Sequence, residues 1–412
     1  MLTESIQNKI NELFQDTPDN VGVAYGNKVI GGQQTNERSI VFMVEKKLPI
    51  NEIPSEEVLP TTINIDGVEY KTDVIEVGKI EVFSCDGTTL GTCYGWQNPS
   101  TPPSNRNTIR PLQGGVSLTS TSKQGTVGTM GFIAVDVETQ AIVGVTNNHV
   151  VIGDAFYTSQ RNLNSTIENE LNDLAYQTGD YQPSPSNLQV GQVVRYVPIY
   201  RIGSPNQYDN YVDGALISLT STTINNTVSF KQYGLTGNIP MPFASTSEIN
   251  NLLSSNPPLY STGRTTGPKE GSPCGLKINA VGVASAVSGY HSQGSTYSAY
   301  YGDLLCFTRI NPDCSWPIYP GDSGSGLIAN FSGTWKIIGL CFAGSQYFGY
   351  AARIDRVANM LGIEAWDGTA KNYIDPTTIQ NITIPGGTST KTTICNAKTY
   401  WQVGLTNTSN PC

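Results

Sequence analysis

The stretch that decides the fold is residues 320–326, Pro-Gly-Asp-Ser-Gly-Ser-Gly, which an apolar run follows at once. Its glycines allow a tight turn that exposes the hydroxyl of Ser323 and lets a bound group approach the backbone. A nucleophilic serine needs such a turn, because backbone N–H groups must point to where an oxyanion forms. We therefore predict that Ser323 is a nucleophile and that the N–H groups of Gly321 and Ser323 form an oxyanion hole. A polar glycine turn without chemistry is the alternative.

A serine nucleophile needs a general base, and the chain has only two histidines. His149 lies where the apolar run 143–151 enters a turn. An imidazole at the end of a strand is well placed to accept the serine proton. His291 lies in the polar segment 288–294, where a solvated histidine is expected. We predict that His149 is the base.

A carboxylate is expected between these two motifs in sequence, because it would orient the imidazole and stabilise its protonated form. Asp213 directly precedes the apolar run 215–219. Asp209 is the competitor in the same loop. The arrangement Asp-Gly-Ala-Leu places the carboxylate of Asp213 at the edge of a strand, and we predict that Asp213 orients His149.

The chain divides into four regions by pattern. Residues 1–79 combine a helical repeat with strand-like runs, which predicts a small α/β module. Residues 80–109 hold a cysteine-bracketed turn and a proline-rich linker. Residues 110–366 consist of short apolar runs between turn residues, which is typical of a mainly β domain of barrel or sandwich type, closed by a helix near 354–361. Residues 367–412 form a Thr/Asn-rich extension that is either a small β element or a tether.

The composition limits the classes of function. The 412 residues carry a net charge of -9 with no basic stripe, so we expect no nucleic-acid partner. No motif for a metal, nucleotide or other cofactor is present, and we expect none to be required. Polar residues interrupt the first ten positions, so we expect no signal peptide, no membrane span and a cytoplasmic or non-classically exported protein.

The eight cysteines leave the redox state open. Cys85 and Cys93 bracket a turn-like segment, and Cys395 and Cys412 lie in the polar extension. Either pair fits a disulfide, and free thiols in a reducing compartment fit equally well.

The order His149, Asp213, Ser323, with the residues around each, resembles trypsin-like (chymotrypsin-fold) serine proteases. The resemblance covers about residues 20 to 365 and implies a chymotrypsin-like double β-barrel with the active site between the barrels. Further segments are similar to a bacterial-type branch that includes the plant Narrow Leaf 1 proteins: 72–78, 110–115, 263–267 and 339–344. Relatives with an N-terminal module sometimes assemble through it, which implies a homo-oligomer.

The resemblance also implies roles for other residues. Pro317, six positions before the serine, corresponds to the base of the primary substrate pocket, and Gly344 and Gly349 correspond to its walls. No carboxylate stands there, so we expect an uncharged side chain of the substrate to bind. In trypsin a newly cut N-terminus pairs with the residue that Asp322 matches. A whole module precedes the barrels here, so Asp322 is not expected to find such an amine.

The sequence therefore predicts a serine endopeptidase that cleaves protein or peptide substrates through an acyl-enzyme. The competing hypothesis is a structural, virion or surface protein that retains the protease-like domain as a scaffold. Ser325, which stands where most of the family has glycine, does not decide between them.

Overall fold

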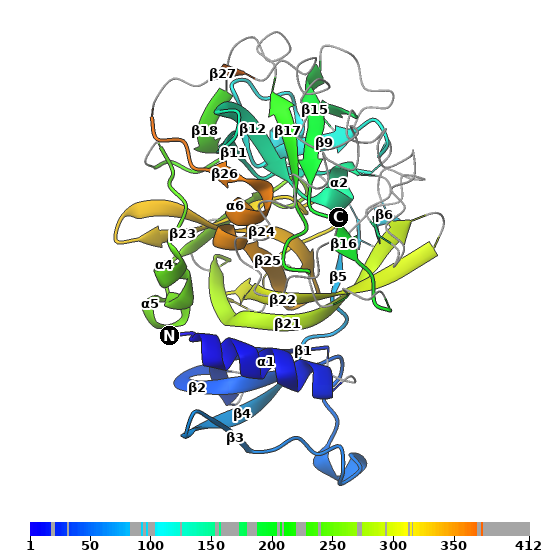
Figure 1. The fold of residues 1–412 in the computed structure, drawn as a ribbon, viewed down its shortest axis with the longest axis vertical. Coiled ribbons are helices and arrows are strands. Elements are labelled where there is room, and N and C mark those ends of the chain that lie inside the picture. Colours follow the sequence, from blue (N-terminus) through cyan, green and yellow to red (C-terminus); the bar gives the residue numbers. More distant parts are fainter. Residues whose placement is uncertain are drawn as a thin grey trace, which may run out of the picture.

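The protein is mainly β, as predicted (Figure 1). The computed structural model describes residues 1–373 except 18–20, 31–32, 83–91, 94–95, 98–103, 124–125, 153–155, 158–172, 179–187, 204–206, 208–209, 220–227, 238–239, 270–273, 293–294, 312–313, 315 and 369–371. The tail from 374 onward, Asp209, Cys85, Cys395 and Cys412 lie outside the described residues.

The larger sheet has 12 strands in the order β20-β19-β23-β24-β25-β22-β21-β1-β2-β4-β3, with β5 beside β21 and β24. Its strands are β1 (Gly22–Ile30), β2 (Gln33–Val44), β3 (Thr62–Ile65), β4 (Val68–Glu76), β5 (Glu81–Val82), β19 (Leu259–Gly263), β20 (Gly267–Lys269), β21 (Leu276–Ser292), β22 (Ser295–Arg309), β23 (Gly326–Phe331), β24 (Thr334–Gly344) and β25 (Gly349–Arg353). Ser323 lies just before β23, so this sheet positions the predicted nucleophile.

The second sheet has 9 strands in the order β10-β9-β14-β15-β17-β12-β11-β26, with β27 beside β12. Its strands are β9 (Val116–Ser120), β10 (Gly128–Met130), β11 (Phe132–Asp136), β12 (Ala141–Thr146), β14 (Leu174–Tyr176), β15 (Gln189–Tyr196), β17 (Ala215–Leu219), β26 (Ile363–Glu364) and β27 (Asn372–Tyr373). Strand β12 leads to His149 and β17 follows Asp213. Because the end of β12 pairs with the start of β17, these two residues lie at the same end of two neighbouring strands of one sheet.

Short strand pairs and helices complete the described structure. The pairs are β13 (Phe156–Tyr157) with β16 (Ile199–Tyr200), β18 (Val228–Gln232) with β8 (Leu112–Gly114), and β6 (Thr92–Cys93) with β7 (Trp96–Gln97). The helices are α1 (Glu4–Asp16), α2 (Asn148–Val151), α4 (Thr246–Asn250), α5 (Leu252–Ser255) and α6 (Ile354–Leu361), with the 3₁₀ turns η1 (Ile50–Glu52) and η2 (Ser104–Arg106). No helix in the described part of the chain is both long and apolar enough to cross a bilayer.

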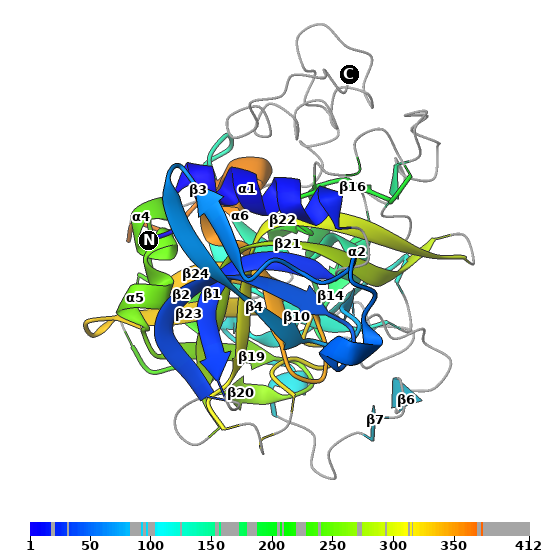
Figure 2. The same ribbon diagram turned by 90° about the horizontal axis from the view of Figure 1, so that it is seen from below.

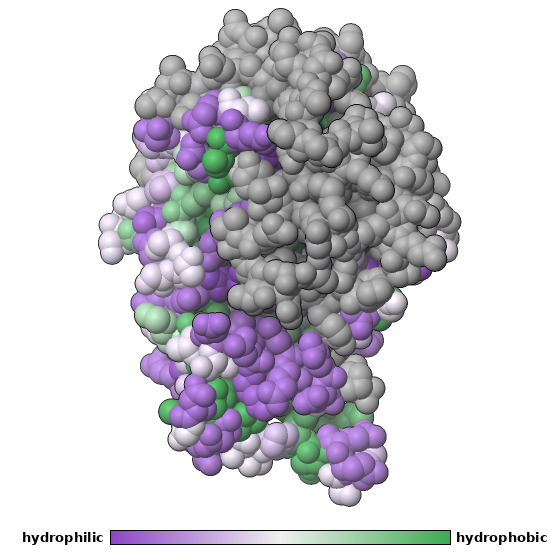
Figure 3. Space-filling view, in the orientation of Figure 1, coloured by the Kyte–Doolittle hydropathy of each residue, from purple (hydrophilic) through white to green (hydrophobic). Residues whose placement is uncertain are grey.

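The N-terminal residues are built onto the larger sheet. Helix α1 begins at a Thr3 cap, where the Thr3 hydroxyl accepts a hydrogen bond from Ile6 N, and it packs on β1 and β21 (Figure 2). Its apolar side is buried, and Phe14 meets the ring of Tyr300 edge-on at 5.3 Å. Its other side carries the hydrophilic band in the lower part of Figure 3. Strand β1 pairs antiparallel with β21, so the N-terminal strands and the strands beyond residue 250 form one continuous sheet.

Candidate active site

The loop before His149 is held by asparagine side chains. Strand β12 ends at Thr146, and Asn147 Nδ2 donates to the carbonyl oxygen of Asp213 at 2.6 Å. Asn148 Nδ2 donates to Val197 O at 2.6 Å. These bonds satisfy backbone groups that leave the sheet at this edge. They fix the short helix α2, on which His149 stands.

His149 and Asp213 are in direct contact. The distance from His149 Nδ1 to Asp213 Oδ2 is 2.6 Å, and the backbone N–H of His149 donates to Asp213 Oδ1 at 3.2 Å. His149 is 5% exposed and Asp213 is fully buried. The second ring nitrogen, His149 Nε2, is buried and has no hydrogen-bond partner among the described residues. The carboxylate therefore fixes one side of the ring and leaves the other side available for a proton.

Ser323 lies on a turn that only glycine can make. Gly321 has φ +91° and Gly324 has φ +92°, in the left-handed region that favours glycine. Within the described part of the chain, neither Gly321 N nor Ser323 N donates a hydrogen bond. The hydroxyl of Ser323, a residue that is 1% exposed, donates to Phe342 O at 3.3 Å.

Thr129 on β10 connects this turn to β12, the strand that leads to His149. Thr129 N donates to Ser323 O at 2.8 Å, and Thr129 Oγ1 donates to Gly321 O at 2.8 Å. Thr146 Oγ1 in turn donates to Thr129 O at 2.7 Å. Thr129 and Thr146 therefore link the Ser323 turn to the strand before His149. No hydrogen bond joins the side chains of Ser323 and His149 among the described residues.

Asp322, next to Ser323, is fully buried and paired with an internal cation. Lys269 Nζ lies 3.1 Å from Asp322 Oδ2, and Lys269 is only 4% exposed. Asp322 also accepts hydrogen bonds from the backbone N–H groups of Thr265, Thr266 and Tyr319 and from the Thr266 hydroxyl. A buried charge is tolerated only when it is paired and hydrogen-bonded in this way. Lys269 therefore supplies the internal cation that pairs with Asp322.

The loop that wraps Asp322 is the segment 263–267. An added Cβ at Gly263 would collide with the Asp322 carboxylate, so glycine is required there. Asn105 Nδ2 donates to Gly263 O at 3.0 Å, and Arg106 Nε donates to Arg264 O at 3.2 Å. Asn105 belongs to the predicted proline-rich linker and is fully buried, where its amide also donates to Gly115 O.

The Lys269–Asp322 pair predicts an alkaline limit to activity. Burial lowers the pKa of Lys269, against the attraction of Asp322, so Lys269 loses its proton below the ordinary lysine value of 10.5. Asp322 is then left without its cation, and activity should fall in that range. Between the lowered pKa of the folded protein and 10.5, the unfolded chain binds more protons than the folded one. The contribution of Lys269 to the free energy of unfolding therefore increases as the pH rises through that range. A pH–activity profile and pH-dependent unfolding measure the two effects separately.

Lys269→Arg supplies the control for this prediction, because arginine keeps its charge throughout the range. Its alkaline limb should move to higher pH. An alkaline limb that is identical in the two proteins would show that Lys269 does not set it.

The three predicted pocket residues do not line one cavity together. Pro317 lines a cavity of about 1200 Å³ whose walls include the hairpin of β1 and β2 and residues 346–348. Gly344 and Gly349 face each other across β24 and β25, and a side chain at Gly349 would meet the ring of Phe307. Neither glycine lines this cavity, and His149, Asp213 and Ser323 do not line it either.

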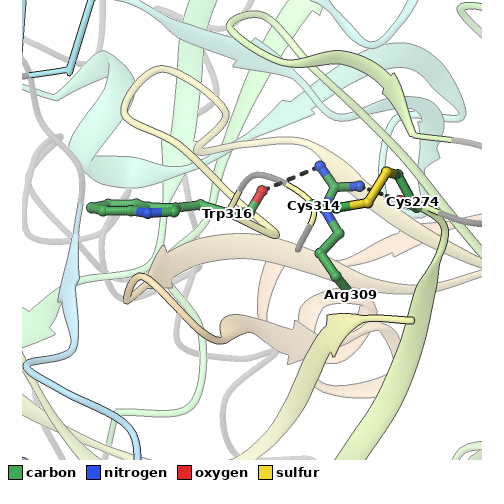
Figure 4. The surroundings of a disulfide bond; sticks show 4 residues. All are labelled: Cys274, Arg309, Cys314 and Trp316. Atoms are coloured by element: carbon green, nitrogen blue, oxygen red, sulfur yellow. Dashed lines mark hydrogen bonds between the residues drawn. A yellow bond between two sulfur atoms is a disulfide. The ribbon is translucent and has the colours of Figure 1, made fainter. Parts of the chain in front are cut away.

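A disulfide that the sequence did not suggest fixes the segment before the nucleophile. Cys274 and Cys314 are bonded across 40 residues (Figure 4). The guanidinium of Arg309 donates to Cys274 O and to Trp316 O, so it joins the two segments of the protein that the disulfide links. The segment that leads to Pro317 is therefore tied to the loop before β21.

Two site residues escaped the sequence analysis, Lys269 and Tyr290. The Tyr290 hydroxyl donates to Asp213 Oδ2 at 3.1 Å. Lys269 adjoins the 263–267 segment, which gave a weak signal, whereas nothing in the sequence around Tyr290 marked it. His291, its neighbour, pairs with Thr296 across the β21–β22 hairpin, and its Nδ1 lies 3.3 Å from Thr296 Oγ1.

Comparison with solved structures finds 162 matching chains, a serine protease among them. The fold is similar to the solved structure of a glutamic acid specific serine protease that is described as using a histidine triad in substrate binding. The TM-score is 0.34 at 14% identity over 61% of this chain and 99% of that chain. No family model matches the chain, and no curated protein matches it. The Narrow Leaf 1-like branch therefore stays a prediction from sequence.

Proposed function

We propose that the protein is a serine endopeptidase that hydrolyses peptide bonds through an acyl-enzyme, with Ser323 as nucleophile and His149 as base. One observation carries the proposal. Asp213 holds His149 at Nδ1 and Nε2 is left buried and unpaired, while Thr129 and Thr146 tie the Ser323 turn to the strand that leads to His149. This is the arrangement that a base needs before it takes a proton.

The proposed reaction starts with rotation of the Ser323 hydroxyl from Phe342 O toward His149 Nε2. Hydrogen bonds of this kind are often long in unliganded sites and tighten when substrate binds. As Oγ attacks the substrate carbonyl, its proton passes to Nε2, and Asp213 stabilises the imidazolium. The imidazolium then protonates the leaving amine. In the second step a water molecule, deprotonated by His149, hydrolyses the acyl-enzyme and releases Ser323.

The free amides of Gly321 and Ser323 support the oxyanion hole of this proposal. Backbone donors aimed at the developing oxyanion contribute a large part of the rate in acyl transfer. Asp322 stands between Gly321 and Ser323 in sequence, and Lys269 is paired with its carboxylate. We propose that this pair keeps the turn in its active form without cleavage of a precursor.

We also infer that the two large sheets are the barrels of a chymotrypsin-like fold. The sheet of β12 and β17 supplies His149 and Asp213, and the sheet of β23 and β24 supplies Ser323. Residues 1–79 contribute no catalytic group in this proposal.

The cysteine nearest the site does not compete with Ser323. Cys341 is fully buried as a free thiol, and burial raises its pKa to about 11. A thiol of that kind stays protonated at neutral pH and is a poor nucleophile.

A scaffold without activity is the second candidate. It is favoured by the hydrogen bond from Ser323 to Phe342 O and by the burial of Ser323. In that case the hydroxyl would remain bound to the carbonyl and would not react.

A serine-reactive fluorophosphonate probe separates these candidates. We expect the native protein to be labelled, and peptide mass spectrometry to locate the adduct on Ser323, because an activated serine attacks phosphorus readily. Heat-denatured protein is the control and should stay unlabelled. Native protein that takes up no probe, or takes it up at another residue, would speak for the scaffold.

A further inference from the structure

Two buried tyrosines approach Asp213 from the β21–β22 hairpin. The Tyr290 hydroxyl lies 3.1 Å from Asp213 Oδ2, and the Tyr301 hydroxyl lies 2.6 Å from that of Tyr290. Each tyrosine is 1% exposed, and their rings stack at 6.4 Å. The Tyr290 ring also meets the ring of His149 edge-on at 6.0 Å. Both members of the His149–Asp213 pair are therefore in contact with Tyr290.

The Asp213 carboxylate determines which group donates in each of these hydrogen bonds. An ionised carboxylate only accepts hydrogen bonds, so Tyr290 must give its single hydroxyl proton to Asp213. The Tyr290 oxygen is then left to accept, and Tyr301 must be the donor to it. The order is fixed as Tyr301 to Tyr290 to Asp213, with the His149 ring donating to the same Oδ2 from the other side.

The backbone holds Tyr290 in place through β5. Ser288 N donates to Ile80 O at 3.0 Å, and the strand then passes Gly289, which has φ +89°. A Cβ at Gly289 would lie only 2.8 Å from Val82 O, so the two strands touch just before Tyr290. The side chain of Tyr290 is thus anchored by the segment that leads out of the N-terminal region.

We infer that Tyr290 is a positioning residue that fixes the Asp213 carboxylate, with Tyr301 supporting it. The inference rests on the proposed peptidase function. Asp213 Oδ2 accepts hydrogen bonds from His149 Nδ1 and Tyr290, and Oδ1 accepts one from His149 N, so both oxygens are held and rotation of the carboxylate away from the imidazole is opposed. The hydrogen bond of Tyr290 reaches Asp213, so we propose that Tyr290 acts on the reaction through that carboxylate.

The hydrogen bonds from Tyr301 to Tyr290 and from Tyr290 to Asp213 persist over the pH range in which a serine protease works. Burial, followed by the neighbouring tyrosine and Asp213, raises the pKa of Tyr290 well above 10.0, and burial does the same for Tyr301. Both hydroxyls therefore keep their protons where a serine protease works.

The test compares three buried tyrosines that differ in what their hydroxyls touch. Tyr290→Phe should lower kcat by about tenfold and leave KM unchanged, because a hydrogen bond to a charged group is lost while substrate contacts stay. Tyr301→Phe should give a smaller loss. Tyr350→Phe is the matched control, because Tyr350 is equally buried and its hydroxyl points to Met43 Sδ at 3.8 Å instead. It should keep the wild-type kcat.

A second measurement does not depend on activity. With isotope-labelled histidine, a chain with only two histidines gives a simple NMR spectrum, in which the proton of the short His149–Asp213 bond can be followed. Tyr290→Phe should shift or broaden this resonance, and Tyr350→Phe should not. His291→Gln assigns the two signals.

The outcomes separate this inference from the proposed function. If wild-type protein turns over peptide while Tyr290→Phe matches Tyr350→Phe in kcat and in the NMR signal, Tyr290 has no positioning role and the peptidase stands. If wild-type protein is inert, the peptidase is wrong, and the NMR comparison still decides whether Tyr290 orders Asp213.

Discussion

Ser323→Ala should abolish peptide hydrolysis, with kcat falling by a factor on the order of 10⁶. Without the hydroxyl no acyl-enzyme can form, and only the oxyanion hole and substrate binding remain. The hydroxyl of Ser323 has a single long hydrogen bond, to Phe342 O at 3.3 Å, so the free energy of unfolding should change by less than about 1 kcal/mol. Turnover of a neutral peptide and thermal unfolding measure the two effects.

Ser325→Ala is the matched control for this prediction. Ser325 lies in the same motif, but its hydroxyl accepts a hydrogen bond from Ser261 Oγ at 3.3 Å. Activity should survive this change. A Ser323→Ala protein that still turns over peptide at the wild-type rate would show that another residue is the nucleophile.

Asp213→Asn should lower kcat by a factor of about 10⁴. Asp213 Oδ2 accepts hydrogen bonds from both His149 Nδ1 and the Tyr290 hydroxyl, and an amide NH₂ placed there would face two donors. If the amide oxygen takes that position, the NH₂ group faces the backbone N–H of His149 instead. Neither orientation stabilises an imidazolium as a carboxylate does, so His149 becomes a weak base.

Asp136→Asn controls for the loss of a buried carboxylate. Asp136 is 2% exposed in the same sheet, where it accepts from Glu138 N and lies 3.3 Å from Arg195. We expect this variant to lose some stability and to keep its kcat. If both asparagine variants showed the same turnover, the proposed role of Asp213 would have to be abandoned.

The sequence was most informative about features that depend on residues close together in the chain. The glycine turn around Ser323 and the helix that α1 forms depend on residues within one short segment. The mainly β class follows from many such segments. These features need no knowledge of distant partners.

The features that the sequence analysis missed depend on contacts between residues far apart in the chain. Lys269 lies 53 residues before Asp322, and Tyr290 lies 77 residues after Asp213. A lone lysine or tyrosine carries no pattern that states its partner. The disulfide from Cys274 to Cys314 has the same difficulty, because a spacing of 40 residues belongs to no recurring motif.

The pairing of β1 with β21 has a consequence for synthesis of the chain. Tyr25 pairs with Val281, a partner that is made 281 − 25 = 256 residues later. At about 5–20 residues per second, roughly 13 to 50 seconds pass before that partner leaves the ribosome. During this time the free edge of β1 lacks its strand partner, and α1 lacks the part of its packing that β21 provides. We expect nascent chains to need protection by chaperones until the β21–β22 hairpin emerges.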